Sequence, residues 1–329
     1  MALGVGVIRG LDPSCYTPHA LHCNAAAWPE TNCYIDMWIE VLNALRFDPI
    51  AMLPICFTAD FEGDQWTFLK PTLEDLFSLY GIDVREMDIW DSISKHSFVQ
   101  VMRGCLPIIE VDAFFLPDTR GVSYQIEHTK TTICINEMDI DSQWLCYFHN
   151  SGYYSLRGSD FQHIFRLDES TNDYTLPPYS EFAKLNSAPP LLKDSLARVS
   201  LNIAARHLQR RPRSNPFVAF RNQLSSDTNS LITGSEGFYH KYAFSNIRLL
   251  GSAFQMAAVY VRWLENQVTG LELAASAFDT ISTESKALLF KLARAANNGK
   301  PVQYNEALDT MEVKWQQAFD LLARRVGGD

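Results

Sequence analysis

The pattern of apolar residues changes near the middle of this 329-residue chain, and that change constrains the fold more than any other feature. Short apolar segments bounded by turn residues predict strands in the first half. After about residue 190 almost no strand pattern remains, and apolar residues recur at helical spacing. Between the halves, the polar stretch Asp168–Pro190 contains four prolines, so we predict a linker there. We expect an α+β domain at residues 1–178, with an antiparallel sheet, followed by an all-α domain at residues 186–329.

In the first half, helices are expected before the sheet. Apolar residues recur at helical spacing from Tyr34 to Leu45, after Thr31 or Asn32 as a cap, and Asp48-Pro49 ends the pattern. A second helix is predicted at Thr72–Tyr80. Strands are predicted at Leu106–Phe115, Thr131–Ile135 and Trp144–Phe148. In the second half, helices are predicted at Leu191–Gln209, Tyr239–Asn266, Leu271–Asn298 and Tyr304–Arg325, which together would form a small bundle.

Charge and cysteine usage narrow the function classes. A net charge of −10 and a pI near 5.3 disfavour an electrostatic nucleic-acid binder, so small molecules and proteins are the expected partners. No apolar run approaches the roughly 20 residues that cross a bilayer, and the N-terminus makes a poor signal peptide. We therefore expect a cytoplasmic protein. Its seven cysteines, an odd number without a repeated C-x-x-C spacing, fit neither a disulfide framework nor a structural zinc site.

One cysteine and one histidine have the sequence context of a catalytic pair. Cys33 is predicted to begin a helix, where unpaired N–H groups and the helix dipole stabilise a thiolate, although it could equally pack beneath the helix. His128 precedes a predicted strand, and His149-Asn150 closes the next strand, so an antiparallel pair would bring these ends together. That arrangement suits a base and its orienting residue. Alternatively, His149 and Asn150 only form the turn before Gly152.

Several of these segments resemble known families. The run Gly104–Pro117, followed by Glu127-His128 and a strand, resembles the N-terminal domain of the butirosin biosynthesis protein H family, which is related to papain-like bacteriocin-processing peptidases. Thr31-Asn32-Cys33 matches the place of the nucleophile in that plan. The resemblance implies a papain-like domain in which Cys33 is the nucleophile and His128 the base. Phe244–Trp263 is loosely similar to the helical C-terminal domain of the same family.

The resemblance also implies an activity. Members of that family move an acyl group from the phosphopantetheine thioester of a carrier protein to an amine. The whole chain is also similar to a bacterial family of undefined function that we associate with amino acid:carrier protein ligases; its signatures are Glu30–Tyr34, Asp60–Trp66 and Tyr147–Asn150. We therefore expect a thiol acyltransferase with no cofactor of its own, because phosphopantetheine arrives on the carrier protein. An acyl or peptidyl carrier protein and an amine, small molecule or amino acid, are the expected partners, without nucleic acid or membrane.

The sequence leaves the third catalytic residue open. The peptidase relatives have Asp-Pro after the strand that follows the histidine, whereas this chain has His149-Asn150. Asn150 could hold the imidazole as the papain-type asparagine does, and Asp112 is a rival third member or an anchor for the substrate amine. The backbone N–H of Cys33, together with the Asn32 side chain, is expected to stabilise the oxyanion.

Two charged segments are candidate binding sites. Asp60, Glu62 and Asp64 alternate like ligands of a hard cation, but without the further carboxylates of a calcium loop we expect no metal and favour a polar substrate loop, with Trp66 in its aromatic wall. A basic cluster in the acidic chain could dock an acidic carrier protein or simply be a solvated helix end. It consists of Arg206, Arg210, Arg211 and Arg213.

Two other functions remain possible on sequence grounds. A cysteine peptidase or amidase could use the same pair of residues, and a non-catalytic binding module could keep the fold without the chemistry. The sequence also leaves open whether Cys23 competes with Cys33 as the nucleophile, and which acyl group, acceptor and oligomeric state apply.

Overall fold

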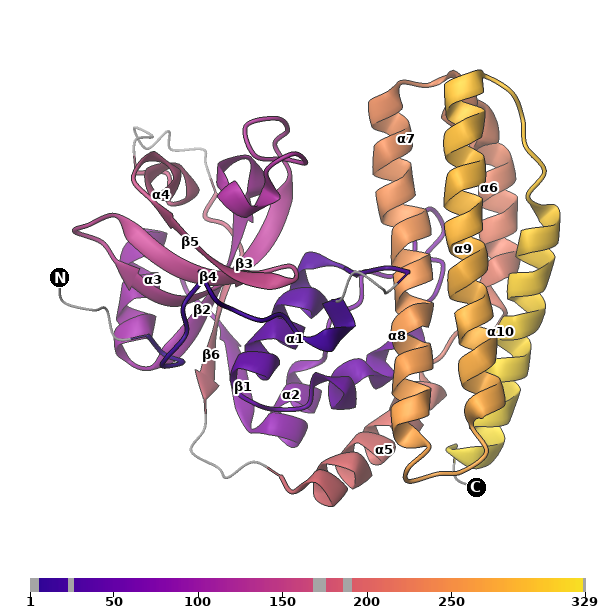
Figure 1. Cartoon of the computed structure of the whole chain (residues 1–329), viewed down its shortest axis with the longest axis horizontal. Helices are drawn as coiled ribbons and strands as arrows, with labels where there is room; N and C mark the ends of the chain where they lie inside the picture. The colour runs from indigo at the N-terminus through magenta and orange to yellow at the C-terminus, as the bar shows by residue number, and fades with distance from the viewer. Residues whose placement is uncertain (1–5, 23–26, 168–175, 186–190, 328–329) are drawn as a thin grey trace. The chain divides into compact units, whose positions relative to one another are not determined.

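The chain forms two compact units in a computed structural model that describes residues 6–22, 27–167, 176–185 and 191–327 (Figure 1). The first, which we call the sheet unit, comprises residues 1–23, 33–49 and 76–190. The second, the helical unit, comprises residues 24–32, 50–75 and 191–329. Two segments from the first half of the sequence therefore belong to the helical unit, which the sequence did not indicate.

A six-stranded antiparallel sheet forms the framework of the sheet unit. Its strands lie in the order β1-β6-β2-β3-β4-β5, and every neighbouring pair is antiparallel. The predictions of an α+β class and of strands at β2, β3 and β4 are confirmed. The strands are β1 (Ile82–Glu86), β2 (Cys105–Asp112), β3 (Lys130–Asp139), β4 (Trp144–His149), β5 (Gly152–Arg157) and β6 (Ser180–Leu185).

Strand β6 corrects the prediction of a linker at Asp168–Pro190. Within this polar stretch Ser180–Leu185 forms a strand, because β1 and β2 pair with it on either side and satisfy its backbone groups. Pro177 and Pro178 precede the strand, separated from it by Tyr179, so they disturb no ladder hydrogen bond. The rest of the predicted linker falls partly on residues 168–175 and 186–190, which lie outside the described residues.

Short helices accompany the strands in the first half of the chain. The predicted helices at Tyr34–Leu45 and Thr72–Tyr80 are confirmed as α1 and α2, whereas α3 and α4 were not predicted. The α-helices are α1 (Cys33–Ala44), α2 (Leu73–Tyr80), α3 (Ile93–Met102) and α4 (Ser159–Ile164). The 3₁₀ segments are η1 (Ala20–His22), η2 (Pro49–Thr58), η3 (Ala113–Phe115) and η4 (Pro117–Thr119).

The two faces of the sheet carry different helices, and side-chain alternation assigns each strand residue to one of them. On one face, Ile109, Val111, Ile133 and Tyr147 pack in a core cluster with residues of α3 and α4; we call it the α3/α4 face. On the other face, the Tyr34 hydroxyl in the first turn of α1 donates to Glu181 of β6 at 2.8 Å. This second face, the α1 face, therefore carries the helix that begins with Cys33.

The helical unit contains long helices around an aromatic core. Helices α7, η5 and α8 follow one another along a single rod, and α9 lies between α8 and α10 (Figure 1). The four helices predicted in the second half are confirmed, but η5 is a π-helical turn within the predicted Tyr239–Asn266 helix, and α6 was not predicted. The elements are α5 (Lys193–Gln209), α6 (Pro216–Thr233), α7 (Glu236–Tyr242), η5 (Ala243–Arg248), α8 (Leu249–Leu264), α9 (Glu272–Asn298) and α10 (Asn305–Arg325). In the described part of the chain, no helix combines the length and apolar character needed to cross a bilayer.

Candidate functional site

The predicted nucleophile occupies the first position of α1. Cys33 is partly exposed, whereas the helix is buried from Tyr34 to Leu42 because it packs on the sheet. The side-chain amide of Asn32, directly before it, donates to the carbonyl oxygen of Leu69 at 3.0 Å. One amide hydrogen of Asn32 is therefore engaged with the backbone, and its predicted part in an oxyanion hole stays a prediction.

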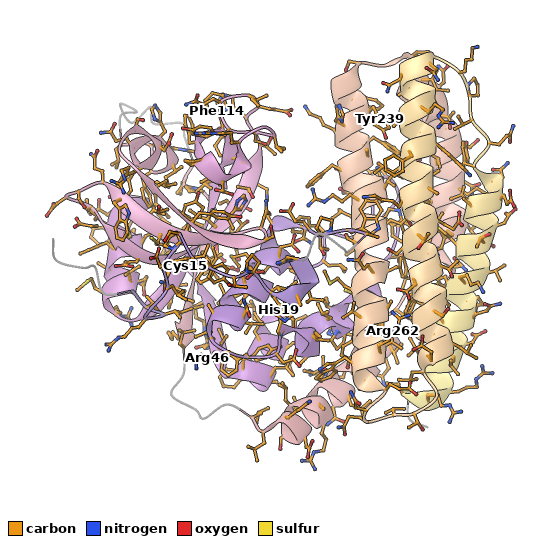
Figure 2. All side chains as sticks on the ribbon, in the orientation of Figure 1. Cys15, His19, Arg46, Phe114, Tyr239 and Arg262 are labelled. Atoms are coloured by element: carbon orange, nitrogen blue, oxygen red, sulfur yellow. The ribbon has the colours of Figure 1, made fainter. Side chains whose placement is uncertain are left out.

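The predicted base, His128, is held by a carboxylate at the end of β2. Its Nδ1 lies 2.5 Å from Oδ2 of Asp112, and the other oxygen of Asp112 accepts from the backbone N–H groups of Phe114 at 3.0 Å and Thr129 at 3.2 Å. The imidazole stacks on the ring of Phe114, with centroids 4.3 Å apart and planes 13° from parallel; Phe114 is labelled in Figure 2. The His128 side chain is 68% exposed, and among the described residues its ring makes no other hydrogen bond. No described residue therefore engages Nε2.

Strand alternation places His128 and Cys33 on the same face of the sheet. Val111 packs in the core of the α3/α4 face. Its neighbours along β2, Glu110 and Asp112, therefore lie on the opposite, α1 face. Asp112 and its partner His128 thus lie at the edge of the α1 face. Among the described residues no hydrogen bond joins the Cys33 sulfur to the His128 ring.

A cavity of about 310 Å³ adjoins His128 and carries charges of both signs. Lys130, the first residue of β3, donates to Glu110 across the β2–β3 pair at 2.8 Å. Arg166 also lines this cavity, and its guanidinium donates to the carbonyl oxygen of Leu176. The exposed His128 imidazole therefore faces a hollow whose walls can hold a polar substrate.

His149 lies on the opposite, α3/α4 face. Its Nδ1 is 2.6 Å from Oδ2 of Asp118, its Nε2 is 2.7 Å from the hydroxyl of Thr131, and the Tyr147 hydroxyl donates to the same Asp118. The start of β3 and the end of β4 do adjoin as predicted, but the residues in contact there are Thr131 and His149. The Asp–His–Thr order has the connectivity of a hydroxyl triad, yet the His149 side chain is 1% exposed, so this network is internal.

Asp112, and not Asn150, contacts His128 in this structure. Asn150 has φ +44° and lies in the tight turn between β4 and β5, as the alternative interpretation of the sequence predicts. His149 is engaged with Asp118, so it does not orient His128. The catalytic roles of all these residues remain predictions.

A buried ion-pair cluster on α1 was missed by sequence reasoning. His22 has a fully buried side chain that contacts Asp36 and Glu40, and the Tyr16 hydroxyl donates to Glu40 at 2.6 Å. Burial alone would lower the pKa of His22, but the hydrogen bonds and negative charges of the two carboxylates raise it to about 9. The cluster fixes the segment before Cys23 on α1; Cys23 itself lies outside the described residues.

The predicted substrate loop is a small hairpin of the helical unit. Trp66 pairs with Phe61 and is only 2% exposed, packed against Phe217, Phe220 and Phe254, so the aromatic core accounts for it. The three carboxylates of this loop each have a different environment. An oxygen of Asp60 accepts from its neighbouring backbone, Glu62 accepts from a threonine, and Asp64 is exposed. Within the described ranges no cluster of three or more histidine, cysteine or acidic residues could hold a metal ion.

The basic cluster lies where α5 ends. Arg206 forms ion pairs with Glu74 at 2.7 Å and with Asp75 at 3.0 Å, so its charge is largely neutralised locally. Arg211 donates to a backbone carbonyl of the last helical turn, while Arg210 and Arg213 are exposed. This placement fits the solvated helix end, and docking of a carrier protein stays a prediction.

Family comparison accounts for nearly the whole chain. A model of the DUF1839 N-terminal domain matches residues 17–185, and a model of the DUF1839 C-terminal domain matches residues 193–324. The chain belongs to the DUF1839 family. The function of this family is undefined, and no curated protein matches the chain. Within the DUF1839 N-terminal domain lie Cys33, Asp112 and His128.

Proposed function

We propose that this DUF1839 protein is a thiol acyltransferase that moves an aminoacyl group from the phosphopantetheine thioester of a carrier protein, through Cys33, to an amine. In this proposal the sheet unit is a papain-like domain with His128 as base and Asp112 as the residue that orients it. The observation that carries the proposal is the Asp112–His128 pair, at 2.5 Å, on the sheet face where Cys33 begins α1.

Asp112 suits the orienting role because of what surrounds it. A carboxylate at Nδ1 selects the tautomer that donates from Nδ1 and leaves Nε2 as the proton acceptor. Two backbone N–H groups, of Phe114 and Thr129, fix the carboxylate, and the Phe114 ring fixes the plane of the imidazole. His128 can therefore turn little without losing one of these contacts.

The first half-reaction forms an acyl-enzyme. The Cys33 sulfur attacks the carbonyl carbon of the thioester while its proton passes to Nε2 of His128. The backbone N–H of Cys33, at the start of a helix, donates to the oxyanion, and one such donor is typically worth about 3 kcal/mol. The bond between carbon and pantetheine sulfur then breaks, and His128 returns the proton to the leaving thiolate. One thioester replaces another, so no ATP is needed.

The second half-reaction transfers the acyl group. An amine nitrogen attacks the Cys33 acyl carbon, the carbon–sulfur bond breaks, and His128 conveys a proton from the nitrogen to the sulfur. Both halves require the sulfur and Nε2 to approach to about 3–3.5 Å. The cavity beside His128, with Glu110 and Lys130 in its wall, is the proposed place for the acceptor.

We propose that the carrier protein docks at the exposed arginines after α5. Within the described ranges, Arg210 and Arg213 lack the local acidic partners that Arg206 has, so they can attract an acidic carrier surface. Reversing both charges with Arg210→Glu and Arg213→Glu should weaken carrier binding most at low salt. Equal affinity of the double variant at low salt would remove this docking site.

The chemistry is tested with aminoacyl-pantetheine thioesters and intact-mass spectrometry. Wild type should gain the mass of one acyl group, and Cys33→Ala should not. Cys15→Ala is the matched control, because Cys15 is an exposed cysteine outside the site. An acyl adduct that survives in Cys33→Ala, or the absence of any adduct on wild type across all twenty thioesters, contradicts the proposal.

The base is tested with a matched pair of histidines. His128 and His163 are both exposed and both stack on a neighbouring phenylalanine, His163 on Phe115 at 4.6 Å. His128→Asn should slow acylation by about 100-fold or more, whereas His163→Asn should leave it unchanged. Cleavage of simple peptides or amides by wild type without thioester transfer would instead indicate the peptidase or amidase alternative.

The approach of the two side chains is tested directly with 1,3-dibromoacetone. This reagent alkylates a thiol and then an imidazole within reach of its three-carbon bridge. Peptide mapping should find Cys33 linked to His128, and Cys15 alkylated without a bridge. Alkylation of Cys33 that never extends to His128 would show that the two side chains do not meet.

A further inference from the structure

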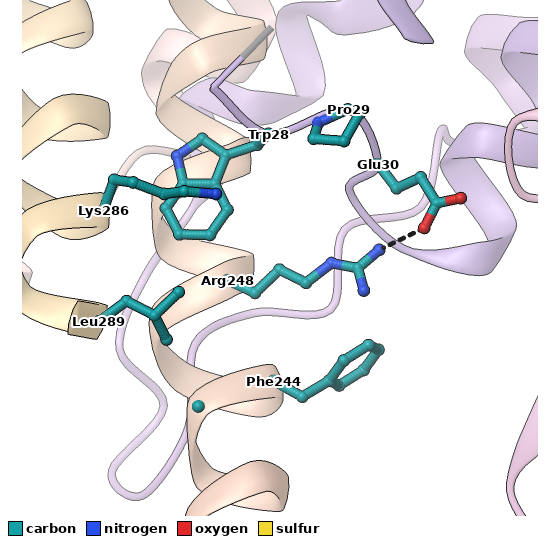
Figure 3. A pocket seen from close by; sticks show the side chains of 8 residues that line it. Trp28, Pro29, Glu30, Phe244, Arg248, Lys286 and Leu289 are labelled. Carbon is teal, nitrogen blue, oxygen red and sulfur yellow. Dashed lines mark hydrogen bonds and ion pairs between the residues drawn. The ribbon is translucent and has the colours of Figure 1, made fainter. Parts of the chain in front are cut away.

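The helical unit contains a cavity of its own, of about 350 Å³ (Figure 3). We propose that it binds an organic monocarboxylate with an apolar body about the size of an aromatic ring. Its walls include an indole, two cationic side chains and two apolar side chains, all from the helical unit. This inference does not rest on the proposed acyl transfer.

Trp28 forms a fixed apolar wall. Its backbone exchanges two hydrogen bonds with the Gln255 side chain, at 2.9 and 2.7 Å, and its indole N–H donates to the carbonyl oxygen of Ser282. On α8 the indole lies directly against Gly251, where an added Cβ would come within 2.3 Å of the ring. A wall clamped between α8 and α9 in this way needs no reordering when a ligand arrives.

Two cations face the cavity with few local anions. The Lys286 ammonium lies 4.4 Å from the centroid of the Trp28 ring and donates to a backbone carbonyl, and it forms no ion pair within the described ranges. Arg248 binds Glu30 through one nitrogen at 3.0 Å, and its remaining N–H groups make no other hydrogen bond to described residues. In Figure 3 the Lys286 side chain runs across the Trp28 indole, and Arg248 lies between Trp28 and Phe244. Two cations and one carboxylate leave a net positive wall, which favours an anion.

The backbone at this cavity is unusual. Phe244 and Arg248 both belong to the π-helical turn η5, and the guanidinium carbon lies 4.9 Å from the centroid of the Phe244 ring. Single π-turns are rare and occur frequently at functional sites. Here the turn places an exposed aromatic ring and a cation together at the cavity, opposite Leu289 of α9.

Size and lining define the ligand class. A cavity of roughly 150 Å³ holds benzene, so one of about 350 Å³ has room for a ring and a short acid chain. The ring would contact Trp28, Leu289 and Phe244. The carboxylate would accept charge-assisted hydrogen bonds from Lys286 and the free edge of Arg248.

The test is calorimetric titration of the full chain with 3-phenylpropionate, 4-methylpentanoate and, as neutral isosteres, their amides. The acids should bind at one site, and each amide about tenfold more weakly, since a hydrogen bond to a charged group is lost. Lys286→Gln should weaken binding of the acids about fivefold. Lys291→Gln, an exposed lysine of the same helix outside the cavity, should not change it.

Further variants and a competitor probe the apolar and anionic halves of the cavity separately. Leu289→Ala should weaken the acids without changing any charge, and Cys33→Ala should bind them as wild type does, whatever the fate of the acyl-transfer proposal. Inorganic phosphate that competes as well as the acids would show a simple anion site and overturn the apolar half of the inference. Equal affinity for acids and amides, or no saturable binding of either acid, would overturn it entirely.

Discussion

The side chain of His22 should stay protonated up to about pH 9 in the folded chain. It is fully buried with Asp36 and Glu40, whose hydrogen bonds and charges outweigh the opposing effect of burial and raise its pKa to about 9. Its pKa in an unfolded chain is about 6.5. The difference corresponds to about 3 kcal/mol of folding free energy, present in full below the unfolded pKa and lost as pH rises through the folded pKa.

The sign and size of this effect can be isolated with His22→Gln, which is neutral at every pH. Between pH 6 and pH 8.5 the unfolding free energy of wild type should fall by about 2 kcal/mol more than that of the variant, because only wild type loses the His22 contribution. At pH 6 the variant should be less stable by about 3 kcal/mol, since Asp36 and Glu40 lose their cationic partner. Urea titrations at each pH measure both quantities, and titrations common to the two proteins cancel in the difference.

Histidine-selective NMR provides the direct assay. The cross-peak that disappears in His22→Gln should report a charged ring at pH 7.5 and titrate near pH 9, while removal of the exposed His163 should leave that peak unchanged. A His22 peak that is neutral at pH 7.5, or unfolding curves of wild type and variant that run parallel from pH 6 to 8.5, would refute the reasoning.

Three further substitutions test the packing. Asp118→Ala should cost about 3–5 kcal/mol in urea unfolding, because the buried His149 ring loses its carboxylate; a loss below 1 kcal/mol would contradict a buried pair. Gly251→Ala should displace Trp28, since the new Cβ would lie 2.3 Å from its ring, and a crystal structure with the indole unmoved would contradict this. Trp66→Ala should cost about 3–5 kcal/mol by opening a cavity in the aromatic core, and retained stability would return Trp66 to the candidate binding residues.

The elements that the sequence predicted are those with strong local periodicity. Helix α1 and the three long helices α8, α9 and α10 keep apolar stripes, and β3 has six consecutive buried residues from Thr131 to Asn136. By contrast, β6 reads Ser-Glu-Phe-Ala-Lys-Leu and is a strand only because β1 and β2 flank it. Pairing partners that are distant in sequence decide whether such a segment forms a strand, and its local β-propensity does not.

Helix α6 was not predicted, although the sequence at its start carries a helix signal. Asn215 caps the helix by accepting from the N–H of Phe217, and Pro216 occupies its first turn, where no hydrogen bond is lost. Phe217, Phe220 and Leu224 then form a buried stripe at helical spacing. The second half of this helix is polar, and it weakened the helical pattern of the segment as a whole.

Predicting the site required knowing which strand residues share a face. Asn150 and Asp112 were both candidate partners of His128, and the 2.5 Å contact between Asp112 and His128, next to the paired ends of β2 and β3, decides between them. His22 could not be predicted as a buried cation, because its carboxylates lie on a helix 14 and 18 residues away and no local pattern joins them. From the sequence alone, the polar residues on α1 are typical of a solvent-exposed helix face, because the sequence does not indicate which second segment covers them.

The segment between β2 and β3 contributes side chains to both faces of the sheet. Asp118, within it, is buried with His149 on the α3/α4 face, whereas Asp112 and His128, at its two ends, hold each other on the α1 face. The backbone N–H of Ala113 donates to Thr129 and closes the base of the segment. Because Asp118 anchors the interior of this loop in a buried hydrogen-bond network, the loop that carries the exposed imidazole is held by more than the single carboxylate of Asp112. In the proposed function His128 is an exposed base that must keep its orientation in water, and such an anchor would serve that role.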